Sequence, residues 1–229
     1  MVAMIEIIPT YVPRDVDDLS LGAENIRKFA KGIHIDVDDG IFAPLTTWPY
    51  SGPAVFEHFD LSHAEGLSSE IHLMVKAPRE VGLAFAGAGA YRIIAHVEGF
   101  ASTEDARYSL KAFKEAGVSE VGLGLLFQTP FALIEPLVAD CDLVHIMSIT
   151  RIGTQGIPYE PTAPARIAEF HRLFPDTVIS VDGGVSKNNI TDLVRAGATS
   201  FGVGAAISKA PDPKAAYEEL RALAESAVH

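Results

Sequence analysis

The stretch TVISVDGGVSKNNITDLVRAGATSFGVGAA, residues 177–206, decides the predicted fold. A short β-branched run at 177–182 ends at a glycine pair, a helical pattern follows at 187–196, and a second apolar run at 199–203 ends at another glycine turn. Parallel pairing of the two strands is expected, because the crossover between parallel strands is usually a helix. These residues therefore predict a βαβ unit with a glycine turn at the end of each strand.

The same alternation runs along the whole chain. Strands are predicted at 4–9, 32–37, 69–75, 91–97, 119–125, 142–148, 177–182 and 199–203. Helices are predicted at 103–116, 129–138, 163–174, 187–196 and 213–226. We expect an α/β protein with one (β/α)8 TIM barrel domain over 1–229, and a doubly wound open sheet is the alternative. Glycine turns after the last two strands favour the barrel, where those loops commonly bind phosphate.

Composition narrows the classes of partner and compartment. A hydrophobic content of 48% supports a large core, and a formal net charge of −12 argues against nucleic acid or an anionic membrane as the main partner. Cys141 is the single cysteine, so no intrachain disulfide can form and a reducing cytoplasm is expected. The first residues lack a basic region typical of signal peptides, and the apolar runs are too short to span a bilayer.

Four polar residues lie in buried-strand patterns that end at or near glycine. His34 and Asp36 belong to GIHIDVDDG, His72 to EIHLMV and Asp182 to VISVDGG. Side chains alternate along a strand, so His34 and Asp36 point to the same face. An ionised carboxylate in an apolar site is costly without a partner. The set predicts one divalent metal ion per chain, with Zn²⁺ favoured over Fe²⁺, Co²⁺ or Mn²⁺, and two carboxylates able to act as acid and base.

Other polar residues have a structural explanation beside a functional one. A histidine on a buried strand is more often a hydrogen-bonded core residue than a ligand, so we assign His96 and His145 to the core. Asp38 fits the loop that leaves the strand, although it shares the parity of Asp36 and can point into a pocket. Arg151 follows the sixth strand in SITRIGTQG, where it either binds a phosphate or is solvated.

Six stretches together form a recognisable pattern. They are HIDVDDGIFAP at 34–44, EIHLMV at 70–75, AHVEG at 95–99, VHIMSI at 144–149, VDGGV at 181–185 and AGATSFGVGAAI at 196–207. In this order, and over nearly the whole chain, they resemble the ribulose-phosphate 3-epimerases and relatives that epimerise other ketose phosphates. The barrel fold of that family agrees with the predicted strands.

The resemblance implies a reaction and a role for each matching residue. A proton leaves the carbon next to a ketone and another returns on the opposite face, while the metal stabilises the enediolate as a Lewis acid. The implied metal ligands are His34, Asp36, His72 and Asp182, of which Asp36 and Asp182 are also the catalytic acid and base. The implied substrate and phosphate contacts are Thr10, Met74, Met147, Arg151, Gly153, Gly156, Gly183, Gly184, Gly204 and Ala205. A homo-oligomer acting on a phosphorylated ketose is expected.

The chain also departs from the family pattern around the substrate. Pro13 stands where a loop serine is usual, and Asp38 replaces the methionine of the usual VMDG segment. RIGTQG replaces the usual PGFGGQ loop, and Ala205 replaces a serine beside the last phosphate glycine. Ribulose 5-phosphate and another ketose phosphate, such as allulose 6-phosphate, both remain candidate substrates.

Two further functions compete with the epimerase. One is a barrel decarboxylase or aldol-type synthase acting on a ribulose-like phosphate, but such families generally use an Asp-x-Lys arrangement and HIDVDDG contains no lysine. The other is a degenerate, non-catalytic sugar-phosphate sensor, suggested by the altered loops. The intact metal and acid–base positions count against the sensor.

Overall fold

The computed structural model describes residues 4–153 and 157–228, and in them eight parallel strands close into a barrel. The strands are β1 Glu6–Tyr11, β2 Gly32–Asp38, β5 Ser68–Met74, β6 Arg92–His96, β7 Glu120–Leu125, β8 Leu143–Met147, β9 Val178–Asp182 and β10 Ser200–Val203. Their order around the barrel is β1-β10-β9-β8-β7-β6-β5-β2, and β2 closes on β1. Each predicted strand is confirmed, and the TIM barrel replaces the open-sheet alternative.

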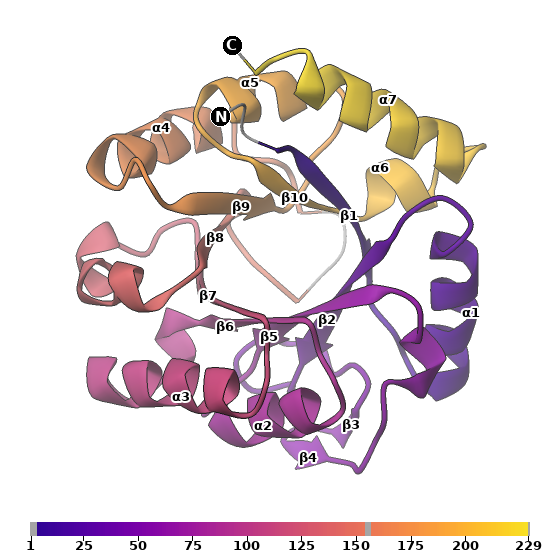
Figure 1. The fold of residues 1–229 in the computed structure, drawn as a ribbon, viewed down its shortest axis with the longest axis vertical. Helices are drawn as coiled ribbons and strands as arrows, with labels where there is room; N and C mark the ends of the chain where they lie inside the picture. The colour runs from indigo at the N-terminus through magenta and orange to yellow at the C-terminus, as the bar shows by residue number, and fades with distance from the viewer. Residues whose placement is uncertain (1–3, 154–156, 229) are drawn as a thin grey trace.

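Helices surround the strands on the outside of the barrel (Figure 1). They are α1 Val16–Ile26, α2 Arg79–Gly87, α3 Thr103–Glu115, α4 Ala163–Leu173, α5 Ile190–Arg195, α6 Ala205–Ser208 and α7 Pro213–Glu225. Short 3₁₀ turns occur at Ser62–Ala64 and Val97–Gly99. The predicted helix 103–116 is confirmed as α3, where the Ser102 hydroxyl accepts the Asp105 amide and Gly117 follows at φ +100°.

The prediction of one helix at 129–138 is wrong. Two short 3₁₀ helices, Phe131–Leu133 and Glu135–Asp140, occupy this stretch. Pro136 lacks the amide hydrogen that an α-helix would use, and its ring would collide with the carbonyl four residues earlier. A proline six residues before it, Pro130, precedes the first turn. The crossover between β7 and β8 is therefore made of turns and no α-helix.

A small hairpin outside the barrel was not predicted. Strands β3 Tyr50–Gly52 and β4 Val55–Phe56 pair antiparallel in the long connection after β2. The Thr47 hydroxyl donates to the Asp36 carbonyl and accepts the Asp38 amide at 2.9 Å, which ties this connection to the end of β2. The connection therefore holds in place the end of β2, which carries Asp36 and Asp38.

Apolar side chains fill the layer between strands and helices, whereas many side chains inside the barrel are polar. On β2, Ile33, Ile35 and Val37 face the helices and are fully buried. The alternate positions of the strands carry charged or imidazole groups into the barrel, where bulky branched residues usually fill the space. Glu70, Arg92 and Glu120 are register neighbours on β5, β6 and β7 and place a charged layer inside.

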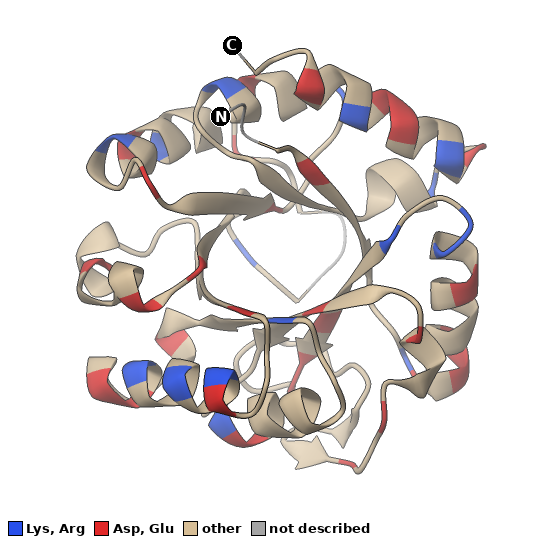
Figure 2. Cartoon of the chain, viewed as in Figure 1, with Lys and Arg blue, Asp and Glu red and all other residues tan. Residues whose placement is uncertain are grey.

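Charged residues of both signs lie along the outer helices, as Figure 2 shows for α3 and α7. Several form exposed ion pairs one helical turn apart, such as Lys111 with Glu115 and Arg221 with Glu225. Pairs of this kind contribute little to stability. No described helix is long and apolar enough to cross a membrane.

Candidate metal and acid–base site

The end of β2 carries three inward-facing polar side chains. His34, Asp36 and Asp38 share one strand face, as their alternate spacing predicts. Asp36 Oδ1 lies 3.1 Å from His34 Nε2 and 2.9 Å from Nδ1 of His72 on β5, the neighbouring strand. Asp36 and His72 are register partners, which brings them together at the carboxyl ends of the strands. In TIM barrels this end holds the active site.

A cluster of potential metal ligands fills this end of the barrel. Within the described residues, His34, His72, His145 and Asp182 each offer one ligand atom, and these atoms lie within 4.8 Å of one another. Three of the four predicted ligands therefore belong to the cluster. Asp36, the fourth, contacts two of its imidazoles. The donor set of imidazoles and carboxylates is consistent with a divalent metal site.

His145 joins the cluster although the sequence assigned it to the core. It is fully buried on β8, and its Nδ1 lies 2.9 Å from the Ser180 hydroxyl. Its Nε2 has no hydrogen-bond partner in the part of the chain that the structure describes. A buried imidazole nitrogen without a partner is costly. If the Nδ1 hydrogen is donated to Ser180, then the Nε2 lone pair is free for a cation.

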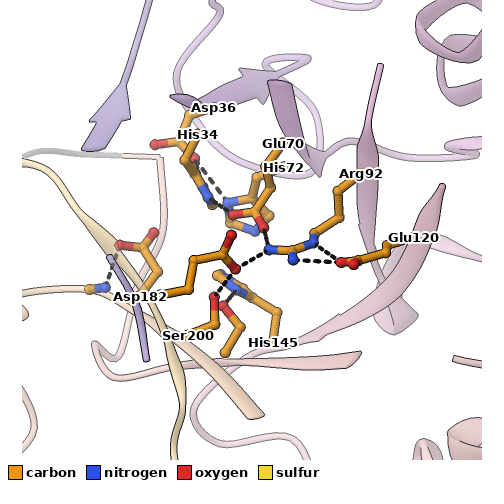
Figure 3. A network of polar contacts seen from close by, with 12 residues as sticks. His34, Asp36, Glu70, His72, Arg92, Glu120, His145, Asp182 and Ser200 are labelled. Carbon is orange, nitrogen blue, oxygen red and sulfur yellow. Dashed lines mark hydrogen bonds and ion pairs between the residues drawn. The ribbon is translucent and has the colours of Figure 1, made fainter. Parts of the chain in front are cut away.

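A charged chain supports His34 from below the cluster (Figure 3). The Glu70 carboxylate hydrogen-bonds His34 Nδ1, and Arg92 Nη1 donates to the same carboxylate. Arg92 also donates from Nε to Glu120 at 2.7 Å and from Nη1 to Glu6 at 3.0 Å. A carboxylate on Nδ1 fixes that nitrogen as the donor, so Nε2 of His34 is presented to the cluster.

A second chain supports His72. Its Nε2 lies 2.9 Å from Nε2 of His96, and His96 Nδ1 lies 3.3 Å from a Glu98 carboxylate oxygen. Glu98 also accepts the Leu126 amide at 2.9 Å. With Nδ1–H of His96 directed to Glu98, the His96 Nε2 accepts a hydrogen from His72 Nε2. That arrangement makes His72 Nδ1, which lies against Asp36, the nitrogen that a cation would bind in place of its hydrogen.

The two predicted acid–base residues have opposite pKa shifts. Burial alone would raise the pKa of Asp36, but hydrogen bonds from His34 and His72 bring it below its usual range. Burial and the charge of Asp36 raise the pKa of Asp182. Burial by itself would lower the pKa of His34. The carboxylates of Asp36 and Glu70 have the opposite effect and bring this pKa well above its usual value. Environments that separate two carboxyl pKa values are suited to acid–base exchange.

A cavity of ≈690 Å³ opens above these groups. Both predicted acid–base residues, Asp36 and Asp182, line it, as do the predicted substrate residues Thr10, Met74, Met147, Gly153, Gly183, Gly184, Gly204 and Ala205. Gly183 and Gly184 adopt φ of +108° and +69°, which favour glycine, and their backbone forms one wall. At Gly202, an added Cβ would lie 3.2 Å from Asp182, so the strand below the cavity also needs a small residue.

Other predicted residues lie elsewhere. Arg151 is exposed and is not among the described residues that line the cavity. Gly156 lies outside the described residues. Pro13 is buried and its carbonyl accepts the Trp48 amide at 3.0 Å, whereas Thr10 reaches the cavity. The end of β1 therefore brings the side chain of Thr10, and not Pro13, to the cavity wall.

The sequence reasoning missed four residues near the site. Glu70 and Arg92 lie on inward strand positions, and the parity that placed His34 and Asp36 could have found them. Ser186 and Lys209 line the cavity beside the glycine loops. They lie in connections after β9 and β10, where no strand or helix periodicity indicates the direction of a side chain.

Comparisons with known proteins identify the family of this chain. A model of the ribulose-phosphate 3 epimerase family matches residues 6–208. Ribulose-phosphate 3-epimerase from Bacillus subtilis is 32% identical over 224 residues, covering 95% of this chain and 99% of the relative. Ribulose-phosphate 3-epimerase from Escherichia coli K12 is 31% identical over 214 residues and 90% of each chain.

Solved structures with low sequence identity share the barrel. The 3-hexulose-6-phosphate synthase of Salmonella typhimurium has a TM-score of 0.67 at 14% identity, over 96% of this chain and 98% of that chain. KGPDC from Streptococcus mutans has a TM-score of 0.69 at 10% identity, over 97% and 98%. These two likenesses establish the fold, while the family match extends to the sequence motifs. This chain belongs to the ribulose-phosphate 3-epimerase family of isomerases.

Proposed function

We propose that this protein inverts C3 of a phosphorylated ketose, either ribulose 5-phosphate or a relative such as allulose 6-phosphate, with a bound divalent cation. The observation that carries the proposal is the meeting of Asp36 and Asp182 with three imidazoles at the floor of one cavity. Family membership supports epimerisation, and the altered loops leave the ketose phosphate to be identified by assay.

The residues present fit a divalent cation. The unpartnered Nε2 of His145 has a lone pair for the ion, and the hydrogen bonds of His34 Nδ1 and His72 Nε2 direct the other nitrogen of each ring into the cluster. His34, His72, His145 and Asp182 would hold the ion, and Asp36, the remaining predicted ligand, lies against the His34 and His72 imidazoles. Zn²⁺ is the favoured ion, with Fe²⁺, Co²⁺ or Mn²⁺ as alternatives. When bound, the cation supplies Lewis-acid stabilisation of the negative charge that develops on the substrate oxygens.

Asp36 and Asp182 would exchange the C3 proton. They lie on β2 and β9, which are separated in the barrel by β1 and β10, so they reach the cavity from different sides. One carboxylate removes the proton from one face of the substrate, and the other carboxyl returns a proton to the opposite face. Hydrogen bonds from His34 and His72 favour the ionised form of Asp36, whereas burial and the charge of Asp36 raise the pKa of Asp182, so the two carboxyl groups differ in their affinity for a proton.

The glycine loops would hold the phosphate. Gly183, Gly184 and Gly204 place backbone at the cavity wall without covering it by side chains, and Lys209 lies beside them. Backbone amides at the last two loops of a barrel are a common phosphate site. This anchors the phosphate end of the ketose on the β9–β10 side of the cavity.

A panel of ketose phosphates assayed for inversion tests the proposed reaction. Ribulose 5-phosphate, allulose 6-phosphate and their C3 epimers are incubated in deuterium oxide, and NMR follows both epimer ratio and deuterium at C3. We expect inversion with deuterium incorporation for at least one pair. Binding of these compounds without either change would favour the sugar-phosphate sensor, and carbon–carbon bond cleavage would favour the lyase alternative.

Metal content gives a second test. The purified protein is expected to bind about one divalent ion per chain. Replacement His145→Leu should weaken the affinity by about tenfold or more and change the visible spectrum of the cobalt form, because a nearby imidazole is lost. Chelator competition measures the affinity, and His171→Leu is the control because His171 lies on α4 outside the cluster. An unchanged affinity and spectrum would show that His145 does not contact the ion.

The expected compartment and assembly are parts of the same proposal. We propose that the protein acts in the cytoplasm as a homo-oligomer, as its family membership and single half-buried cysteine suggest. Sedimentation at micromolar concentration measures the assembly directly, and a monomer mass would exclude it.

A further inference from the structure

Asp38 places a carboxyl group in the cavity wall between two other acidic residues, Asp36 and Asp39, and a small apolar cluster. Its residue is 1% exposed and lines the cavity two positions beyond Asp36. The surrounding wall is formed by Met74, Met147 and Ile152, which belong to a small apolar cluster above the barrel. A carboxyl group in such a wall loses its hydration unless a polar partner replaces the water.

The backbone of Asp38 is fixed by hydrogen bonds, whereas one oxygen of its carboxyl group has no hydrogen-bond partner among the described residues. Its amide donates to the Thr47 hydroxyl at 2.9 Å and its carbonyl accepts the Thr47 amide at 3.1 Å. In residues 4–153 and 157–228, its Oδ1 has no hydrogen-bond partner. Asp39 differs, because its carboxylate accepts the amides of Ile41, Phe42 and Lys76. Asp39 thus holds the loop, whereas Asp38 Oδ1, which faces Gly153, has no partner among the described residues.

The position of Asp38 indicates which part of a ketose phosphate it meets. The phosphate end is assigned to the loops after β9 and β10, with the reacting carbon between Asp36 and Asp182. Asp38 is the register partner of Met74, so it lies on the β2–β5 side of the cavity. In a ketose phosphate, the C1 hydroxymethyl group and the phosphate stand at opposite ends of the carbon chain. A molecule anchored at the glycine loops therefore directs its C1 end away from them.

We propose that Asp38 hydrogen-bonds the C1 hydroxyl of the substrate and so selects ketose phosphates that carry it. This inference rests on the proposed function and deepens it, because it assigns a specificity-determining residue. A pocket that pairs a buried polar group with a substrate hydroxyl rejects an analogue lacking the hydroxyl, since the polar group is then left without a partner.

The test compares xylulose 5-phosphate with 1-deoxyxylulose 5-phosphate, which lacks only the C1 hydroxyl. We measure kcat/KM for epimerisation of each compound by wild type, Asp38→Asn and Asp38→Leu, and Asp38→Ala replaces Asp38→Leu if the latter fails to fold. Wild type is expected to prefer the hydroxylated compound by about 10–100-fold, the range for a hydrogen bond to a charged or buried group. Asp38→Leu should reduce that ratio to about threefold or less, whereas Asp38→Asn should keep most of it.

The ratio of kcat/KM for the two compounds separates loss of the hydrogen bond to the C1 hydroxyl from other effects of replacing Asp38. A general loss of charge near the acid–base pair would change kcat/KM for both compounds equally and leave the ratio as in wild type, which would overturn the proposal. Asp140→Asn, on the outer surface beside Arg107, is the matched control and should keep the wild-type ratio. Failure of wild type to epimerise either compound or any other ketose phosphate would overturn the proposed function itself, and this inference with it.

Discussion

Replacement of either Asp36 or Asp182 by asparagine is expected to reduce C3 inversion by roughly 10²–10⁴-fold, because an amide cannot exchange a proton as a carboxyl group does. The two variants should differ in deuterium exchange. A two-base reaction leaves one carboxyl group in each variant, so each retains C3 exchange with only one of the two epimers. Asp36→Asn should retain it with one epimer, and Asp182→Asn with the other.

The measurement is NMR-detected exchange at C3, started from each epimer separately. Metal content is determined for every sample, because both residues contact or belong to the ligand cluster. A variant that keeps its metal but loses inversion has lost proton transfer, whereas loss of both identifies a ligand. Asp140→Asn should behave as wild type. Undiminished inversion in both site variants would show that other residues transfer the proton.

Replacement Arg92→Met is expected to lower the free energy of unfolding by about 3–5 kcal/mol, because it leaves the buried Glu70 carboxylate without its cation. The Arg92 side chain is 7% exposed and pairs with Glu70 and Glu120 (Figure 3). It also pairs with Glu6, at 3.0 Å. Burial would raise the pKa of Glu70, but His34 and Arg92 lower it to about 2, so this carboxylate is ionised at neutral pH and loses a stabilising charge when Arg92 is replaced. Urea unfolding at neutral pH measures the change.

Two further variants identify the cause of the loss. Arg107→Met removes an exposed ion pair with Asp140 and should cost less than about 1 kcal/mol. Adding Glu70→Gln to Arg92→Met should recover part of the stability, because the most buried carboxylate is then neutral. All samples contain chelator, so that a bound ion does not contribute to the comparison. A change below about 1 kcal/mol in Arg92→Met would contradict a structural role for this network.

The strands were predictable because each is a short apolar run that ends at a turn. Residues 32–37 illustrate this, since β2 begins at Gly32 and ends at Asp38 in the structure. The helix predicted at 129–138 failed because its apolar spacing suggests a helix while Pro136 removes a backbone donor. The hairpin at β3 and β4 was missed because strands of two or three residues have too short a pattern to recognise.

The sequence by itself determined the barrel, the shared face of His34 and Asp36, and the family, because strand parity and motif order are local properties of the chain. Tertiary structure decided that His145 belongs to the ligand cluster, since its neighbours there come from other strands. It also decided that Arg92 supports His34 through Glu70 and that Arg151 does not line the cavity. Such contacts depend on barrel closure, which brings side chains from distant strands within hydrogen-bonding distance.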